Sequence, residues 1–123
     1  MTYLLQHATR RLRSSREARV DENVRLNLPG FYGDAYVRVF VGDTSLVRVR
    51  RRRLPEPRIR LRVADCDNTI SLWFSLDCEE ERENALFKID TLLASLHRFR
   101  DALADEVDLR AERERRKELA CRT

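Results

Sequence analysis

Arginine alternates with aliphatic residues over two neighbouring segments of the chain, 46–52 and 58–63. Successive side chains of a β-strand point to opposite faces, so arginines two positions apart share a face. If the two segments pair as an antiparallel ribbon, all of these arginines line one side of it: Arg48, Arg50, Arg52, Arg58, Arg60 and Arg62. Because the guanidinium group is a planar fork that matches phosphates and carboxylates, this pattern predicts a surface that binds an anion.

The elements that must position these arginines form, by their sequence pattern, a five-stranded antiparallel meander. Alternating polar and apolar residues, separated by Gly, Pro, Asp and Asn, predict strands over Val24–Leu28, Ala35–Val41, Ser45–Arg52, Arg58–Val63 and Thr69–Leu76. Short connections favour antiparallel neighbours, and every connection accepts a register that keeps one face of the sheet apolar. The opposite face then carries the arginines together with Arg38, Tyr36, Phe40 and Trp73.

Two helices are expected to flank this sheet. Residues 1–17 read as a short basic helix, and residues 78–119 read as a long helix without Gly or Pro. Apolar residues recur in the long helix at alternating spacings of four and three, which indicates a stripe that packs on the apolar face of the sheet. The sequence therefore predicts an α+β fold, with the sheet over 23–76 and a single domain over 1–123.

The predicted long helix has more apolar length than one sheet can cover. Its residues would span about 63 Å, whereas a strand of seven residues covers roughly 23 Å. Either the helix breaks near Asp105–Asp108 and folds back, or its apolar stripe contacts a second copy of the chain. We favour a homodimer, with a contact made by Leu92, Leu96, Phe99 and Leu103.

Three environments are possible for the face that carries these arginines. Nucleic acid is the commonest polyanion, and the aromatic residues Tyr36, Phe40 and Trp73 on the same face can stack on unpaired bases. An acidic protein, or the acidic helix of a neighbouring subunit, is the second candidate. A face that is simply solvated, or one whose aromatic residues are covered by the N-terminal helix, is the third.

Composition and motifs narrow the functional class. The chain has a net charge of +4 and 37% charged residues, and no apolar run approaches the length of a membrane span. The first residues lack the charge and apolar core of a signal peptide, and the three cysteines read as free thiols, so a cytoplasmic location is expected. No catalytic motif, cofactor motif or metal-ligand spacing is present.

We therefore predict a non-enzymatic nucleic-acid-binding protein without a cofactor or a metal. The alternative is a protein-interaction module, or a small regulator encoded by a phage or mobile element. Such a protein would dimerise through its C-terminal helix and bind an acidic protein partner.

Overall fold

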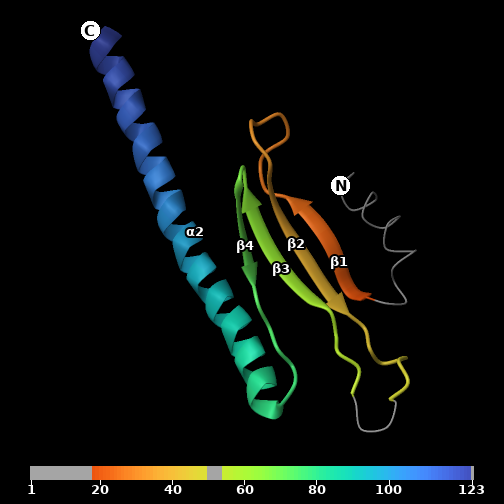
Figure 1. Ribbon diagram of the computed structural model, residues 1–123. Helices are drawn as coiled ribbons and strands as arrows, with labels where there is room; N and C mark the ends of the chain where they lie inside the picture. The colour runs from red at the N-terminus through yellow and green to blue at the C-terminus, as the bar shows by residue number, and fades with distance from the viewer. Residues whose placement is uncertain (1–17, 50–53, 123) are drawn as a thin grey trace. The chain divides into compact units, whose positions relative to one another are not determined.

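The computed structural model describes residues 18–49 and 54–122. Four strands follow one another in a single sheet, each antiparallel to the next (Figure 1), and a helix follows the sheet in the sequence. The elements are β1 (Ala18–Arg25), β2 (Ala35–Gly42), β3 (Ile59–Asp65), β4 (Asn68–Leu72) and α2 (Glu79–Arg122). The α+β class is thus confirmed, with four described strands instead of five. The helix predicted over residues 1–17 lies outside the described residues.

The register of the sheet separates an apolar face from a polar one. Val37 of β2 lies opposite Val63 of β3, and Val63 lies opposite Ile70 of β4. Leu61 in turn lies opposite Leu72. Because directly opposite residues share a face, these pairs align the apolar residues across three strands. The register predicted between β3 and β4 pairs Val63 with Ile70 and Leu61 with Leu72, and both pairs are confirmed. The predicted third pair, Ile59 with Phe74, is not formed because β4 ends at Leu72.

The first strand begins earlier than the sequence pattern predicts. We expected Val24–Leu28, whereas β1 starts at Ala18 and its last residue, Arg25, lies opposite Tyr36. Val20 and Val24 share the apolar face with Glu22 between them, and this glutamate interrupts the apolar alternation on which the prediction depended. The predicted boundaries were therefore wrong, and so was the predicted register, which placed Leu26 beside Val37 where the structure has Val24. Only the antiparallel pairing of this strand with β2 was right.

The predicted strand Ser45–Arg52 is wrong in its described part, because residues 45–49 form a turn and an irregular segment. The backbone N–H of Ser45 donates to the Asp43 carboxylate at 2.9 Å. β2 instead pairs directly with β3, and the N–H of Gly42 donates to the carbonyl of Arg58 at 2.7 Å. The predicted ribbon would have placed three pairs of arginines opposite one another, and such like-charge pairs repel. The observed pairing has one, Arg38 opposite Arg62.

A tight hairpin turn at Cys66 and Asp67 connects β3 to β4, as predicted, and Asp65 and Asn68 lie opposite each other across it. Cys66 adopts the left-handed conformation, with φ of 52°. β4 is shorter than the predicted strand Thr69–Leu76, because it ends at Leu72. The three cysteines are free and exposed.

Helix α2 is continuous from Glu79 to Arg122, so the predicted alternative of a break near Asp105–Asp108 is wrong. Three glutamates occupy its first turn, where negative charge is stabilised by the helix dipole. The Ser75 hydroxyl, which precedes the helix, donates a hydrogen bond to the carboxylate of Glu81. With 44 residues, α2 is about 66 Å long. No described helix has the combination of length and apolar character that a membrane span requires.

The chain divides into two compact units, one ending at Glu81 and the other beginning at Arg82. The packing of the helix on the sheet and the single domain stay predictions. Among the described residues, the buried side chains are all alanines: Ala35, Ala64 and Ala85. Larger apolar side chains are half-buried or exposed, including Ile70 on the apolar face, with an exposed fraction of 65%. Much of the apolar surface in the described residues is thus open to further contact.

Candidate nucleic-acid interface

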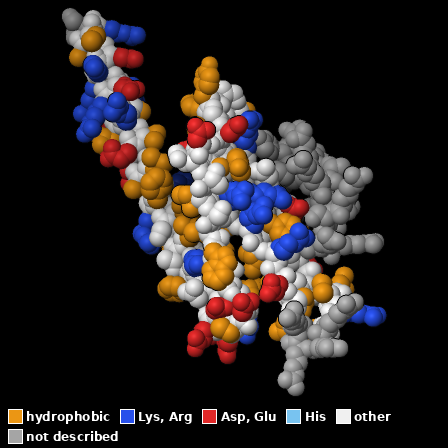
Figure 2. Space-filling model, viewed as in Figure 1, with side chains coloured by type: hydrophobic (Ala, Val, Ile, Leu, Met, Phe, Trp, Pro, Cys, Tyr) orange, Lys and Arg blue, Asp and Glu red, His pale blue; other side chains and the backbone are white. Residues whose placement is uncertain are grey.

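Five of the predicted site residues lie together on the polar face of the sheet. Arg38 lies opposite Arg62, and Phe40 lies opposite Arg60, in the pairing of β2 with β3. Tyr36 shares this face because it lies two positions before Arg38 in the same strand. Figure 2 shows Lys and Arg side chains gathered over the middle of the sheet, beside hydrophobic side chains.

A sixth residue, Arg58, joins this cluster just before β3 begins. Its guanidinium carbon lies 5.3 Å from the centre of the Phe40 ring, which is within the range of a cation–π contact. We define the arginine face as the set of these six residues: Tyr36, Arg38, Phe40, Arg58, Arg60 and Arg62. Arg58 and Arg60 are exposed, while the other four are half-buried.

Internal partners neutralise only part of the arginine face. Arg38 forms an ion pair with Asp21 at 2.6 Å. The Nε of Arg62 donates to the hydroxyl of Ser71 at 3.3 Å, a contact that leaves its positive charge uncompensated. Within residues 18–49 and 54–122, no carboxylate forms an ion pair with Arg58, Arg60 or Arg62. Arg58, just before β3, and Arg60 and Arg62 within it therefore have no anionic counterpart in the described chain.

The remaining predicted site residues are not brought to this face. Arg48 lies in the irregular connection after β2 and is exposed. Arg50 and Arg52 lie outside the described residues. Trp73 directly follows β4 and has an exposed fraction of 74%, so it is accessible but is not part of the paired sheet. The predicted strand Thr69–Leu76 would have placed Trp73 beside Arg60, but β4 ends at Leu72.

The residues predicted to form a dimer contact lie on α2. Leu92 is half-buried, while Leu96, Phe99 and Leu103 are exposed by 51%, 64% and 50%. Their spacing of four, three and four residues places them on one side of the helix. This stripe is thus accessible, as a dimer contact requires.

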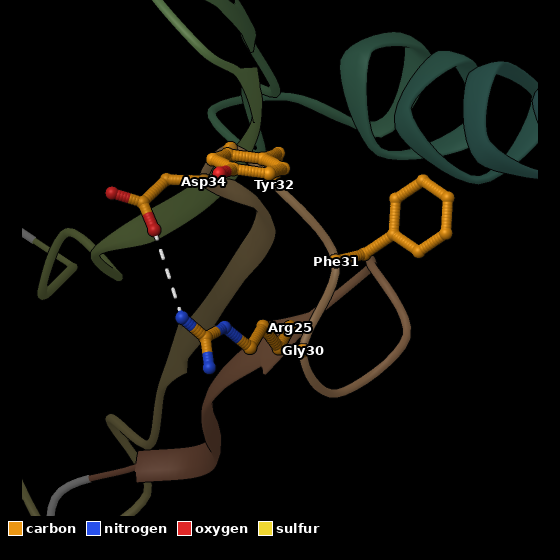
Figure 3. A pocket seen from close by; sticks show the side chains of 6 residues that line it. Arg25, Gly30, Phe31, Tyr32 and Asp34 are labelled. Carbon is orange, nitrogen blue, oxygen red and sulfur yellow. Dashed lines mark ion pairs between the residues drawn. The ribbon is translucent and has the colours of Figure 1, made fainter.

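A second accessible group, which the sequence pattern did not reveal, lies in the loop between β1 and β2. Tyr32 is exposed by 99% and Phe31 by 72%, which is unusual for adjacent aromatic residues. Figure 3 shows that the Tyr32 ring lies on the side of the loop where the Arg25 side chain reaches Asp34. The Phe31 ring lies on the other side. The feature of the sequence that could have indicated this group is a pair of aromatic residues between two glycines, Gly30 and Gly33.

Hydrogen bonds hold this loop in a defined conformation. The Asn27 side-chain amide donates to the carbonyls of Tyr32 and Gly33 at 3.3 and 3.0 Å. The N–H of Cys66, in the β3–β4 turn, donates to the carbonyl of Asp34 at 2.7 Å. Both glycines have positive φ, a conformation that glycine adopts without steric cost. Tyr32 is therefore presented on a fixed support.

The connection after β2 is held by an ionised carboxylate. Hydrogen bonds from the side chain and the backbone of Ser45 lower the pKa of Asp43 from its ordinary value. The Arg19 guanidinium, 3.2 Å from the same carboxylate, acts in the same direction. This cluster fixes the start of the segment that departs from the sheet at Gly42.

Among the described residues, no three His, Cys, Asp or Glu side chains are grouped so that they can hold a metal ion. Comparisons of the chain with protein-family models, with curated proteins and with solved structures found no match. Function must therefore be inferred from the residues themselves.

Proposed function

We propose that this chain is a nucleic-acid-binding protein whose arginine face contacts the phosphate backbone. The observation that carries the proposal is the row of Arg58, Arg60 and Arg62, which has no carboxylate partner in the described segments. Arginine binds phosphate oxygens through paired, charge-assisted hydrogen bonds. Such contacts supply most of the affinity of a protein for nucleic acid and make that affinity dependent on salt.

Aromatic residues on the same face support nucleic acid over a simple inorganic anion. Tyr36 and Phe40 lie four residues apart on β2, a separation of about 13 Å along the strand. Both are half-buried, and Arg38 lies between them on the same face of β2. Phe40 lies opposite Arg60 of β3, and Tyr36 lies opposite Arg25 of β1, so that phosphate-binding and base-stacking groups alternate over the sheet. An inorganic anion would use the arginines but not the rings.

Fluorescence anisotropy with labelled single-stranded and double-stranded oligonucleotides at two salt concentrations tests this proposal. The double variant Arg60→Glu, Arg62→Glu should lose binding while its circular dichroism spectrum stays unchanged. The matched control is Arg113→Glu with Arg115→Glu on α2, which changes the net charge equally and should keep binding. An equal loss of binding in both double variants would mean that net charge, and not the arginine face, determines binding. Wild-type protein that binds no oligonucleotide, but copurifies with an acidic protein, would instead favour a protein partner.

A second proposal concerns self-association through α2, and a specific observation favours it. The helix is continuous and about 66 Å long, while the longest strands have eight residues and span roughly 27 Å. One sheet therefore cannot cover the whole stripe, and Leu96, Phe99 and Leu103 are at least half exposed. A second copy presents the same stripe, and the spacing of these residues fits helix-to-helix packing.

Sedimentation equilibrium tests this second proposal. The wild-type chain should sediment as a dimer, and Leu96→Asp with Phe99→Asp should sediment as a monomer. The control is Ala94→Asp with Arg98→Asp, at positions outside the stripe, which should stay dimeric. A monomeric wild-type chain at high concentration would contradict the proposal.

A further inference from the structure

We infer that the β1–β2 loop is a binding site for one unpaired nucleotide, whose base stacks on Tyr32 and whose phosphate contacts Arg25. This inference rests on the proposed function and narrows it from nucleic acid in general to single strands. A base inside a duplex is stacked on both sides, so it cannot offer a face to a tyrosine ring.

The first support is the exposure of Tyr32 on a loop that is already fixed. The residue is 99% exposed, while its backbone carbonyl accepts a hydrogen bond from the Asn27 side chain. An exposed aromatic ring on an ordered backbone loses little conformational entropy when a ligand binds to it. The geometry thus presents a preformed stacking surface.

The second support is the position of Arg25 beside this ring. Arg25 and Tyr32 line the same open hollow of about 430 Å³, together with Phe31 and Asp34. Arg25 is also the register partner of Tyr36, so its side chain leaves the sheet on the same side as the arginine face. A single strand bound to the arginine face can therefore continue into the loop without changing faces.

Asp34 opposes the binding of phosphate in this hollow. Its carboxylate lies 3.7 Å from the terminal nitrogen of Arg25, and both side chains are more than half exposed. Such an exposed pair is weak and exchanges its partner readily. A phosphate that replaces the Asp34 carboxylate at Arg25 still experiences the nearby negative charge, so removal of that charge should tighten binding.

The site therefore predicts opposite effects for two substitutions in one loop. Tyr32→Ala should weaken binding of a labelled oligothymidylate about five-fold or more, since stacking of one base contributes this order of affinity. Asp34→Asn should strengthen it about two-fold or more. The control Leu28→Ala removes an exposed apolar side chain of the same loop that does not line the hollow, and it should leave binding unchanged. Binding of a duplex of the same length should not respond to Tyr32→Ala.

The outcomes separate this inference from the proposal on which it rests. If Arg60→Glu with Arg62→Glu abolishes binding while Tyr32→Ala and Asp34→Asn have no effect, the loop site is overturned and the arginine face stands. If Leu28→Ala and Tyr32→Ala weaken binding equally, the loop acts as a general apolar surface and the inference fails. If the wild-type chain binds neither strand form, both fail.

Discussion

The guanidinium group of Arg38 lies 2.6 Å from the carboxylate of Asp21 on the neighbouring strand. Both side chains are largely shielded, with exposed fractions of 33% and 27%. The pair holds β1 to β2 by a charge-assisted hydrogen bond, and it neutralises the only arginine of β2 on the arginine face. The positive charge available to a ligand is therefore concentrated along β3, next to β4.

Asp21→Asn should affect binding and stability in opposite directions. Loss of the carboxylate leaves Arg38 as an additional cation for phosphate, so we expect about two-fold tighter binding of an oligonucleotide. It also removes a partly buried charged hydrogen bond, which should lower the free energy of unfolding by about 1 kcal/mol. Anisotropy and urea denaturation measure the two effects. A variant that is less stable but binds no more tightly would exclude Arg38 from the binding surface.

Single arginine substitutions on β3 should change the salt dependence of binding. If Arg60 contacts one phosphate, Arg60→Ala should reduce the slope of log affinity against log salt concentration by about one unit. Arg113→Ala on α2 serves as the control and should leave the slope unchanged. An unchanged slope for Arg60→Ala would mean that its guanidinium group does not contact a phosphate.

Two glycines in the β1–β2 loop should differ in their tolerance of a side chain. Gly30 and Gly33 both have positive φ, so alanine at either position is strained by about 1 kcal/mol. A Cβ atom at Gly33 would also lie 3.1 Å from the Sγ of Cys66, whereas nothing lies within 4 Å at Gly30. Gly33→Ala should therefore lower the free energy of unfolding more than Gly30→Ala in urea denaturation. Equal losses would indicate that Cys66 moves aside freely.

Asp43 should contribute stability that is lost in acid. Its folded-state pKa is lowered, chiefly by the hydrogen bonds from Ser45, so folding favours the ionised carboxylate. This contribution is fully present above the ordinary pKa of 3.8 and is lost as the pH falls through the lower folded-state value. Thermal melting should therefore show a smaller loss of stability in acid for Asp43→Asn than for the wild-type chain. Identical pH profiles would contradict this role.

The sequence predicted those parts of the fold in which local pattern and long-range pairing agree. In β3 and β4, alternating residues flank a turn with Asp and Asn, and the predicted register is correct. The segment Ser45–Arg52 also alternates, but alternation cannot reveal that β2 pairs with β3 and leaves this segment without a partner. The position of β1 was predicted wrongly because Glu22 occupies a position on the apolar face. The sequence pattern alone does not show why a glutamate stands there.

The candidate site was predictable to the same extent. Alternation alone places Arg60 and Arg62 on one face, and the pairing of β2 with β3 adds Arg38 and Phe40. The loop containing Tyr32 could not be recognised from spacing, because the exposure of an aromatic residue depends on the conformation of the whole turn. Hydrogen bonds from Asn27 and Cys66 create that conformation, and neither residue belongs to a binding motif.

Because the buried side chains are small, the stability of this chain can depend on its concentration in the cell. Ala35, Ala64 and Ala85 contribute little apolar area, so most of the hydrophobic stabilisation must come from covering the larger apolar side chains, by the predicted packing of α2 on the sheet or by another molecule. Where another copy supplies that cover, mass action links folding to concentration. Dilution would then unfold the chain and expose it to proteolysis, so the amount of protein made would itself set how much of it is functional.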